Sequence, residues 1–391
     1  MLVTVQRTPM KPEDFETTAA GELVRANGPN GEHWAFLPHP LPPQMPLEWQ
    51  LVVRLSAADR ALGELAGVGR HVPNPQMLIQ PFIRREAVLS SRIEGTKASV
   101  GDVYAFEAGD KSKQGDEDVR EVANYVRAMD YGLDVMADRN VTSGLLRELH
   151  RILLTGVRGE QDRPGEFRDC PVFIGHNKLE DARFVPPPVV HLRDALEAFD
   201  RYLAAAHDYP PLIRLAWLHY QFEAIHPFRD GNGRIGRLLI SLLLVHWKLL
   251  PLPLLYLSAF FERNRREYYD HLLRVSTHGD WSGWTAYFLS GVIEQATDAA
   301  GRAKRLQDLQ LQWRALAQGG SHVSAGVLKT IDFLFQRPYL NASTIQELCT
   351  VSHPTAMNIT KKLAELGFVQ EVTGKARDRL FVASEIVAIV N

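Results

Sequence analysis

The sequence predicts a mainly α protein with one small β-hairpin and a separate C-terminal helix-turn-helix unit. Apolar residues recur with helical spacing over most of residues 51–300. Two short β-prone runs flank a polar turn at 172–186, and residues 321–391 combine three short helical patterns with two β-prone runs. With 391 residues and 45% hydrophobic content, the chain is long enough for two or three domains.

The composition indicates which partners and which compartment to expect. The formal net charge of -2 predicts neither bulk binding to nucleic acid nor attraction to anionic membranes. Cys170 and Cys349 lie far apart and form no metal spacing or disulfide framework, which fits a reducing, cytoplasmic environment. The N-terminus lacks the apolar run of a signal peptide, and the most apolar region, 238–257, is interrupted by charge and proline. We therefore expect a cytoplasmic protein without a membrane segment.

The N-terminal region, 1–100, begins with about 50 proline-rich residues that predict an extended arm. A helical period follows at 51–67, and a second helix is expected at 81–94, with Gly95 as its C-cap. After a polar loop at 109–118, we expect further helices at 119–137, 142–154, 190–206, 211–225, 234–249, 261–275 and 281–299. These helices would form a core domain over residues 101–300.

The last 91 residues of the sequence predict a linker and a small unit. An amphipathic connecting helix at 301–318 leads into a Gly-Gly-Ser hinge at 319–321, so residues 301–320 join the core to a unit at 321–391. That unit predicts a winged helix-turn-helix, with helices and β-prone runs at 324–336, 343–349, 354–366, 368–372 and 380–382.

Residues 226–237 hold the densest chemistry of the chain. The glycines of Gly231-Asn232-Gly233 let backbone N–H groups approach a ligand, and a helix that begins just after them directs its unpaired N–H groups to the same place. This predicts an anion site, most simply for phosphates. A lone histidine at a helix end is usually structural, but beside such a turn His226 is a candidate general base.

Charged residues in the same stretch suit a nucleotide with its metal ion. Asp230 is either a solvated loop residue or a ligand of Mg²⁺, which binds one or two carboxylates together with phosphate oxygens and water. Arg234 and Arg237 lie three residues apart on one helical face; next to this turn we expect them to bind phosphate oxygens rather than serve as surface charges. Phe228 and Ile235 are expected in the core.

The stretch from His226 to Arg237 resembles the signature of the Fic family, His-Pro-Phe, any residue, Asp or Glu, Gly-Asn-Gly-Arg, two residues, Arg. The resemblance implies a helical Fic fold over roughly residues 100–300. It also implies transfer of AMP from ATP to a hydroxyl group of a protein, with release of pyrophosphate. Self-modification is an expected outcome. The Gly-Asn-Gly-Arg sequence argues against the branch of the family that transfers phosphate.

The resemblance also implies roles for individual residues. His226 would deprotonate the target hydroxyl, Phe228 would anchor the loop, and Asp230 would hold Mg²⁺. The α- and β-phosphates of ATP would be bound by the start of the helix, and the γ-phosphate by its second arginine. The expected ATP-binding segment is therefore Gly231, Asn232, Gly233, Arg234, Ile235, Gly236 and Arg237.

A second motif lies in the helix expected at 81–94. Ser90 and Glu94 share one helical face and are followed by Gly95, which resembles the inhibitory motif of the same family. On its own such a pair is more often an ordinary polar face. The resemblance implies that Glu94 pairs with Arg237 and displaces the γ-phosphate, because a carboxylate and a phosphate compete for one guanidinium. This is the subclass whose inhibitory helix precedes the core.

Two further segments resemble parts of the family site. The hairpin at 172–186 is similar to the flap that pairs with an extended target segment; an ordinary surface hairpin is the alternative. Tyr268 and Tyr269 fall in a segment similar to the one beside the nucleoside, where they would contact ATP, although tyrosine pairs on helices are mostly core residues.

Several functional alternatives stay open at this stage. The same residues in reverse would make a de-AMPylase, and the C-terminal unit would suit a nucleotide-sensing DNA-binding regulator. From residue 321 onward the sequence contains seven Lys or Arg and six Asp or Glu. This near-neutral charge weakens the interpretation as a DNA-binding unit and favours a protein partner or self-association. Family members often form dimers, so a homodimer is also open.

Overall fold

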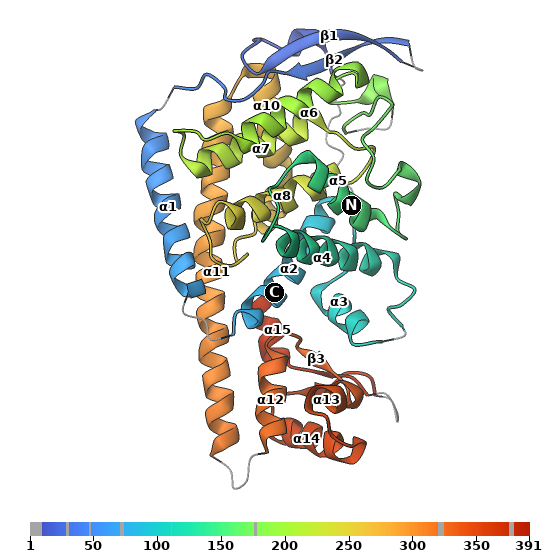
Figure 1. Ribbon diagram of the computed structural model, residues 1–391, viewed down its shortest axis with the longest axis vertical. Coiled ribbons are helices and arrows are strands. Elements are labelled where there is room, and N and C mark those ends of the chain that lie inside the picture. The colour runs from blue at the N-terminus through green and yellow to red at the C-terminus, as the bar shows by residue number, and fades with distance from the viewer. Residues whose placement is uncertain are drawn as a thin grey trace.

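The computed structural model describes residues 10–28, 31–46, 48–70, 74–110, 112–175, 178–319, 324–374 and 379–391. The described chain is mainly helical, as predicted, with a two-stranded sheet near the N-terminus and a three-stranded sheet near the C-terminus. Figure 1 shows the helical core above and the C-terminal unit below, joined along one long helix. No described helix has the length and apolar character needed to cross a membrane.

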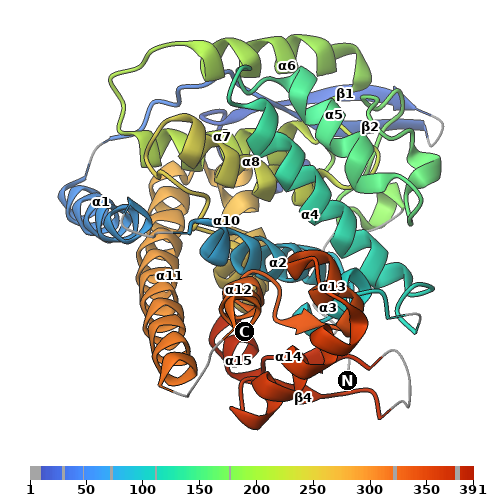
Figure 2. The ribbon, with the colours of Figure 1, turned by 60° about the horizontal axis from the view of Figure 1, so that its bottom comes forward.

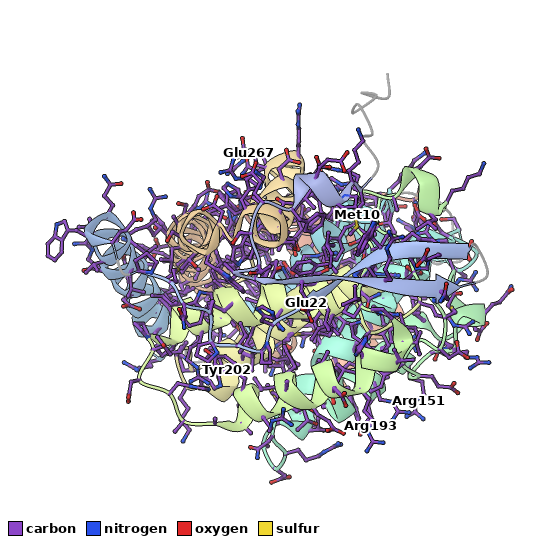
Figure 3. All side chains as sticks on the ribbon, turned by 90° about the horizontal axis from the view of Figure 1, so that it is seen from above. Met10, Glu22, Arg151, Arg193, Tyr202 and Glu267 are labelled. Atoms are coloured by element: carbon purple, nitrogen blue, oxygen red, sulfur yellow. The ribbon has the colours of Figure 1, made fainter. Side chains whose placement is uncertain are left out.

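The N-terminal region contains a β-hairpin where the sequence predicted an extended arm. Strands β1 (Gly21–Gly28) and β2 (Gly31–Pro38) pair antiparallel along their whole length. The buried ring of Phe36 packs on Phe184, and the Phe36 N–H donates to the Val185 carbonyl at 2.9 Å. Seen from above, the hairpin lies across the helical core (Figure 3). Four prolines of this region, at 40, 42, 43 and 46, follow β2, so their density did not indicate the strands that precede them.

One 38-residue helix, α11 (Trp281–Gln318), replaces the two helices predicted at 281–299 and 301–318. The predicted boundary fell at 300–301, but the one glycine there, Gly301, costs a helix only about 1 kcal/mol. Buried Ala299, Ala300 and Ala303 surround it and pack closely, which offsets that cost. Helix α1 (Trp49–Arg70), predicted at 51–67, runs alongside the upper half of α11 (Figure 1).

The centre of the core is built on α7 (Pro211–Ile225) and α8 (Asn232–His246), which are apolar on nearly all sides. Helix α6 (Val189–Ala204) packs on α7, while α4 (Glu117–Val135) and α5 (Ser143–Leu154) pack on each other and on α8. Because both central helices are held by several neighbours, the loop between them is anchored at both ends.

Helix α2 (Gln76–Ile93) begins five residues before its predicted start and includes Pro81. The short helix α3 (Val100–Glu107) was not predicted, although Ser99 and Asp102 form a capping box at its start. The buried guanidinium of Arg84 on α2 forms a bidentate ion pair with Glu107, at 2.8 and 2.9 Å. Helices α2 and α3 are thereby linked.

The helix predicted at 261–275 is divided into α9 (Ser258–Arg263) and α10 (Arg265–His278). The division lies at Asn264, whose φ of -108° and ψ of 36° are not helical. Its side-chain amide donates to the Phe260 carbonyl at 3.0 Å, which offers the backbone a local alternative to the helix.

The C-terminal unit contains the predicted order of helices and β-strands, with two additions. Its elements are α12 (Ala325–Leu334), β3 (Tyr339–Leu340), α13 (Ala342–Cys349), α14 (His353–Glu365), β4 (Gln370–Glu371), β5 (Phe381–Val382) and α15 (Ser384–Val390). The three strands form an antiparallel sheet in the order β3-β5-β4 (Figure 2 shows the unit from below). The last two hinge positions, 320 and 321, lie outside the described residues, and the assignment as a winged helix domain stays a prediction.

Candidate active site

A cavity of about 480 Å³ lies where the end of α7, the start of α8, the end of α2 and one face of α10 meet. Its wall includes Glu94, His226, Asp230, Arg237 and Tyr269. Residues separated by more than a hundred positions therefore share one cavity. The flap, residues 172–186, contributes Phe173, Ile174, Gly175, Arg183 and Phe184 to the same wall.

The loop between α7 and α8 has two residues with left-handed backbone conformation. His226 ends α7 at φ 50° and ψ 62°, and Gly231 precedes α8 at φ 75°. The Asn232 side chain donates to the Phe228 carbonyl at 2.9 Å and accepts from the Phe228 N–H at 2.8 Å. The amide group of Asn232 therefore shapes the loop, and the backbone N–H groups of the first turn of α8 supply the anion-binding potential.

His150, on α5, supports this loop from below and was not singled out in the sequence. Its ring stacks on Phe228 with 3.9 Å between centroids. The Gly165 N–H donates to Nδ1 at 2.8 Å, so Nε2 of the neutral ring carries the proton and donates to the Asp230 carbonyl at 3.0 Å. Burial lowers the pKa of His150 to about 4, which keeps the ring neutral. In the sequence it was one histidine on an apolar helix, without a functional signal.

His226, the candidate general base, lies at the end of α7 on the cavity wall. Its Nδ1 lies 3.2 Å from the Glu223 carbonyl, which can only accept, so Nδ1 carries the proton and Nε2 keeps its lone pair. Burial lowers the pKa of His226 to about 4, against a smaller opposing effect of the hydrogen bond to Glu223. The imidazole is thus neutral at physiological pH, as a base must be.

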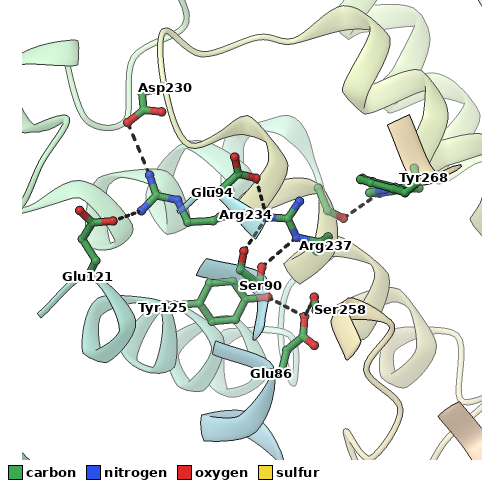
Figure 4. Close-up of polar contacts among 12 residues, drawn as sticks. Glu86, Ser90, Glu94, Glu121, Tyr125, Asp230, Arg234, Arg237, Ser258 and Tyr268 are labelled. Atoms are coloured by element: carbon green, nitrogen blue, oxygen red, sulfur yellow. Dashed lines mark hydrogen bonds and ion pairs between the residues drawn. The ribbon is translucent and has the colours of Figure 1, made fainter. Parts of the chain in front are cut away.

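Arg237 and Glu94 form an ion pair in the cavity wall, as drawn in Figure 4. Nη2 of Arg237 lies 2.7 Å from the Glu94 carboxylate and donates to the Ser90 carbonyl at 2.9 Å. Nε of Arg237 donates to Oγ of Ser90, also at 2.9 Å. Burial alone would raise the pKa of Glu94, but the charge of Arg237 lowers it below its ordinary value. Glu94 caps the end of α2, and Gly95 follows it at φ 106°. The predicted pairing is present.

Arg234 has different partners from Arg237. Its guanidinium, of which 1% is exposed, lies 3.2 Å from Glu121 on α4 and 3.5 Å from Asp230 (Figure 4). Its charge lies beneath the loop, where it adds positive potential to the start of α8. The two arginines predicted to grip phosphates are both buried and both already paired with carboxylates.

The carboxylate of Asp230 fits a magnesium ion that arrives with phosphates. Its side chain is 44% exposed and lies on the cavity wall beside the start of α8. The described residues contain no group of three or more His, Cys, Asp or Glu side chains that could hold a metal ion without help. Mg²⁺ is commonly held by one or two carboxylates plus substrate phosphates, so a single carboxylate here is a sufficient protein contribution.

Of the two predicted nucleoside contacts, only Tyr269 lies on the cavity wall. Tyr268 is buried, and its hydroxyl is 2.8 Å from Nε2 of His219 in the core, so its placement does not match the predicted ATP contact. Ile235 is likewise fully buried, and the Gly236 carbonyl accepts from Nδ1 of His219 at 3.2 Å. Ile235 and Gly236 therefore belong to the packing of α8, whereas the sequence grouped them with the ATP-binding residues.

The flap consists of two extended segments joined by a single bridge between Ile174 and Phe184 in the described residues. The Ile174 N–H donates to the Phe184 carbonyl, and the Arg183 N–H donates to the Ile174 carbonyl, both at 2.9 Å. The predicted hairpin is therefore short, and its turn at 176–177 lies outside the described residues. Strand β2 runs beside its second segment through the bond from Phe36 to Val185.

Three polar residues near the cavity were not predicted to be functional; Arg168 and Glu86 are buried and Glu223 is partly buried. Arg168 precedes the flap and contacts the loop, Glu223 lines the cavity one turn before His226, and Glu86 lies under α2. Burial raises the pKa of both Glu86 and Glu223 to about 7. Glu86 accepts from Ser258 and Tyr125 through Oε1 (Figure 4). Oε2 of Glu86 and Oε1 of Glu223 are both buried without a hydrogen-bond partner among the described residues.

Comparison with known proteins agrees with this geometry. A model of the Fic/DOC family matches residues 140–244, and a model of the N-terminal region of that family matches residues 52–134. A protein adenylyltransferase Fic from Drosophila persimilis is 33% identical over 135 residues, 34% of this chain and 23% of the relative. Its counterpart in Drosophila melanogaster is 32% identical over 143 residues, 36% of this chain and 26% of the relative. The chain thus spans about a quarter of these relatives.

A solved structure is similar over most of the fold. A Fic family protein from Desulfovibrio desulfuricans superposes with a TM-score of 0.55 and 20% identity, covering 88% of this chain and 98% of that one. This likeness confirms the Fic fold. The chain thus has the Fic fold, and within it residues 140–244 match the Fic/DOC family while residues 52–134 match the N-terminal region of that family.

Proposed function

We propose that the protein is an adenylyltransferase that transfers AMP from ATP to a hydroxyl group of a protein and is inhibited by its own Glu94. The observation that carries the proposal is the arrangement of Arg237, which lies in one cavity with His226 and is paired there with Glu94. The similarity to curated protein adenylyltransferases supports the same class of reaction.

The proposed reaction uses the neutral ring of His226. Its Nε2 takes the proton of the acceptor hydroxyl, whose oxygen forms a bond to the α-phosphorus of ATP. The bond from that phosphorus to the bridging oxygen of the β-phosphate breaks, and pyrophosphate leaves. The N–H groups at the start of α8 and the charge of Arg234 stabilise the phosphate oxygens. Asp230 would hold the Mg²⁺ that neutralises part of the phosphate charge.

Inhibition follows from competition for one guanidinium. Arg237 is 2% exposed, and a buried charge needs a partner. Glu94 supplies that partner in the resting protein, and the γ-phosphate would supply it in the active complex. Both are anions, so they cannot share the position without strong repulsion.

Label transfer tests the proposal. With ATP labelled on the α-phosphate, we expect Glu94→Gly to label protein more strongly than the wild type. A charged hydrogen bond contributes about 1.5–3 kcal/mol, which corresponds to a rise on the order of 10- to 100-fold. Adding His226→Ala should abolish the label, whereas Glu267→Gln, an exposed change on α10 (Figure 3), should not. Transfer of label from γ-labelled ATP would exclude adenylyl transfer.

Removal of AMP is the second candidate. The carboxylate of Glu94 lies on the cavity wall and is 31% exposed, so it can accept a proton from water within the site. The water oxygen would bond to phosphorus and the bond to the modified side chain would break. His226, protonated from solvent beforehand, would give its proton to the departing oxygen, and Glu94 would pass the proton of the water back to solvent. In that case the wild type removes AMP from a modified protein, and Glu94→Gly loses this activity while it gains transfer.

A further inference from the structure

Arg168 is a buried arginine whose side chain, among the described residues, donates hydrogen bonds only to backbone carbonyl groups. Nε donates to the carbonyl of His226 at 2.8 Å, and Nη2 donates to that of Pro187 at 2.6 Å. Longer contacts of 3.4 Å reach the carbonyls of Cys170 and Ile225. Only 2% of the residue is exposed.

A buried guanidinium is normally neutralised by a carboxylate, and the described residues place none within ion-pair distance of Arg168. Burial lowers its pKa to about 10, which still leaves it charged at neutral pH. The carbonyls of Ile225 and His226 lie at the C-terminal end of α7, where the last carbonyls lack helical partners and the helix dipole is negative. The end of α7 thus replaces the missing carboxylate.

The contacts of Arg168 fix the peptide of the proposed general base. His226 has a left-handed backbone conformation that costs a residue other than glycine about 1–3 kcal/mol unless its surroundings enforce it. Arg168 holds the carbonyl of His226, and its own backbone N–H donates to the next carbonyl, that of Pro227, at 2.9 Å. Two consecutive carbonyls of the loop are therefore held by one residue.

The same guanidinium reaches the base of the flap. Pro187 directly follows the flap and leads into α6, so the bond at 2.6 Å joins the end of the flap to the loop that carries His226. Since the flap lines the cavity, a shift of the flap relative to the loop would move its residues relative to Nε2 of His226.

We propose that Arg168 is a positioning residue for adenylyl transfer, which locks the His226 peptide and the base of the flap into one rigid unit. The inference rests on the proposed function. Arg168 touches neither nucleotide nor acceptor in this role; it acts through His226 and the flap. Misplacement of a reacting group by about 1 Å can cost a rate on the order of 100-fold, so the effect is measurable.

The test uses Glu94→Gly as the parent and α-labelled ATP as the probe. We expect Arg168→Ala to lower transfer on the order of 100-fold, while the affinity for ATP in a His226→Ala background changes less than about threefold. Guanidinium at millimolar concentration, far below denaturing levels, should restore part of the transfer in Arg168→Ala, but none in His226→Ala. Arg193→Ala, an exposed arginine on α6 (Figure 3), is the matched control.

A second readout separates positioning from general stability. The charge of Arg168 lowers the pKa of His226, which the charges of Glu94 and Asp230 raise. The acidic limb of the transfer rate should therefore move to higher pH in Arg168→Ala. It should stay in place in Arg168→Lys, which keeps the charge but cannot reach all the carbonyls, while transfer falls about tenfold.

The outcomes are distinct. Full transfer in Arg168→Lys and in Arg168→Ala, with an unchanged pH profile, overturns the inference. A loss of transfer that is matched by an equal loss of ATP affinity in both variants also overturns the inference. If Arg168→Ala does not fold, the lysine variant alone decides. A parent that labels no protein contradicts the proposed function instead, and is recognised before any Arg168 variant is compared.

Discussion

Arg237 is the residue on which the proposed regulation depends. Its side chain is almost fully buried and receives one anionic partner, Glu94, together with two oxygens of Ser90. A buried guanidinium without an anion is costly, so Arg237 must exchange one anion for another rather than release Glu94 into an empty site. The resting and active states then differ by which carboxylate or phosphate it holds.

Glu86 makes a residue-scale prediction about stability. Burial raises its pKa to about 7, against roughly 4.3 for a carboxyl in an unfolded chain. Between these two pKa values the folded protein binds more protons than the unfolded chain. The contribution of the Glu86 carboxyl to the free energy of unfolding is therefore lost as the pH rises from about 4.5 through 7. Glu86→Gln should remove this loss and stabilise the protein at pH 8 by on the order of 3 kcal/mol relative to its effect at pH 4.5.

Urea unfolding at pH 4.5, 6 and 8 measures this difference. The amide oxygen of glutamine can still accept from Ser258 and Tyr125. Its NH2 group replaces Oε2, which has no partner among the described residues, and the cost of that unpaired donor is the same at each pH, so it cancels in the comparison between pH values. Glu267→Gln, an exposed acid, should leave the pH dependence as it is in the wild type. Parallel curves for wild type and Glu86→Gln would show that the buried carboxyl is not the source.

At the scale of elements, the end of α2 carries Glu94, the proposed inhibitor. Glu94 is the C-cap of this helix, and Gly95 continues it at φ 106°, a conformation that only glycine adopts without strain. The turn therefore aims the Glu94 carboxylate at Arg237. Ser90, one turn earlier on the same face, contacts the same guanidinium.

Gly95→Ala tests this element. A side chain at this left-handed position should lower the free energy of unfolding by roughly 1–2 kcal/mol, although nothing lies within 4 Å of the added methyl group. The matched control is Gly301→Ala, inside α11, where space is also free and a stabilisation of roughly 0.5–1 kcal/mol is expected. Equal signs for the two substitutions in chemical unfolding would contradict the backbone argument.

At the scale of the whole molecule, the C-terminal unit is packed against the N-terminal part of the core as well as against α11. Trp313 of α11 stacks on Phe368 with 4.4 Å between centroids. Tyr339 stacks on Tyr104 of α3 at 6.0 Å, and the Asn341 side chain donates to the Ala108 carbonyl at 3.1 Å. Helix α15 packs on α2 (Figure 2). Helix α2, the proposed inhibitory helix, therefore has neighbours both in α8 and in the C-terminal unit.

The sequence predicted the helical core and the central loop because their signals are local. Residues 226–237 are contiguous, so spacing alone brought His226, Asp230 and Arg237 together. The supporting residues come from elsewhere: His150 lies on α5, and Arg168 lies before the flap. Each is a common residue without a local pattern, and its role depends on which backbone groups the fold brings to it.

Other differences arise where tertiary packing overrides local preference. The sequence predicted one helix that ends at 299 and another that begins at 301. Helix α11 is continuous through Gly301 because the surrounding residues are buried. The hairpin of β1 and β2 was hidden by nearby prolines, and it is stabilised by contacts with the flap that no local pattern records. Tyr268 and Tyr269 are adjacent, so only the direction of α10 in space could assign one to the core and one to the cavity.

The exchange of Glu94 for a γ-phosphate on Arg237 is most directly tested by comparing the affinities for ATP and AMP. In a His226→Ala background, which prevents turnover, titration calorimetry with Mg²⁺ would measure both nucleotides with and without Glu94→Gly. We predict that removal of the Glu94 carboxylate tightens ATP binding on the order of 10-fold or more, and leaves AMP, which has no γ-phosphate, unchanged within about twofold. Equal gains for ATP and AMP, or no gain for ATP, would contradict the account.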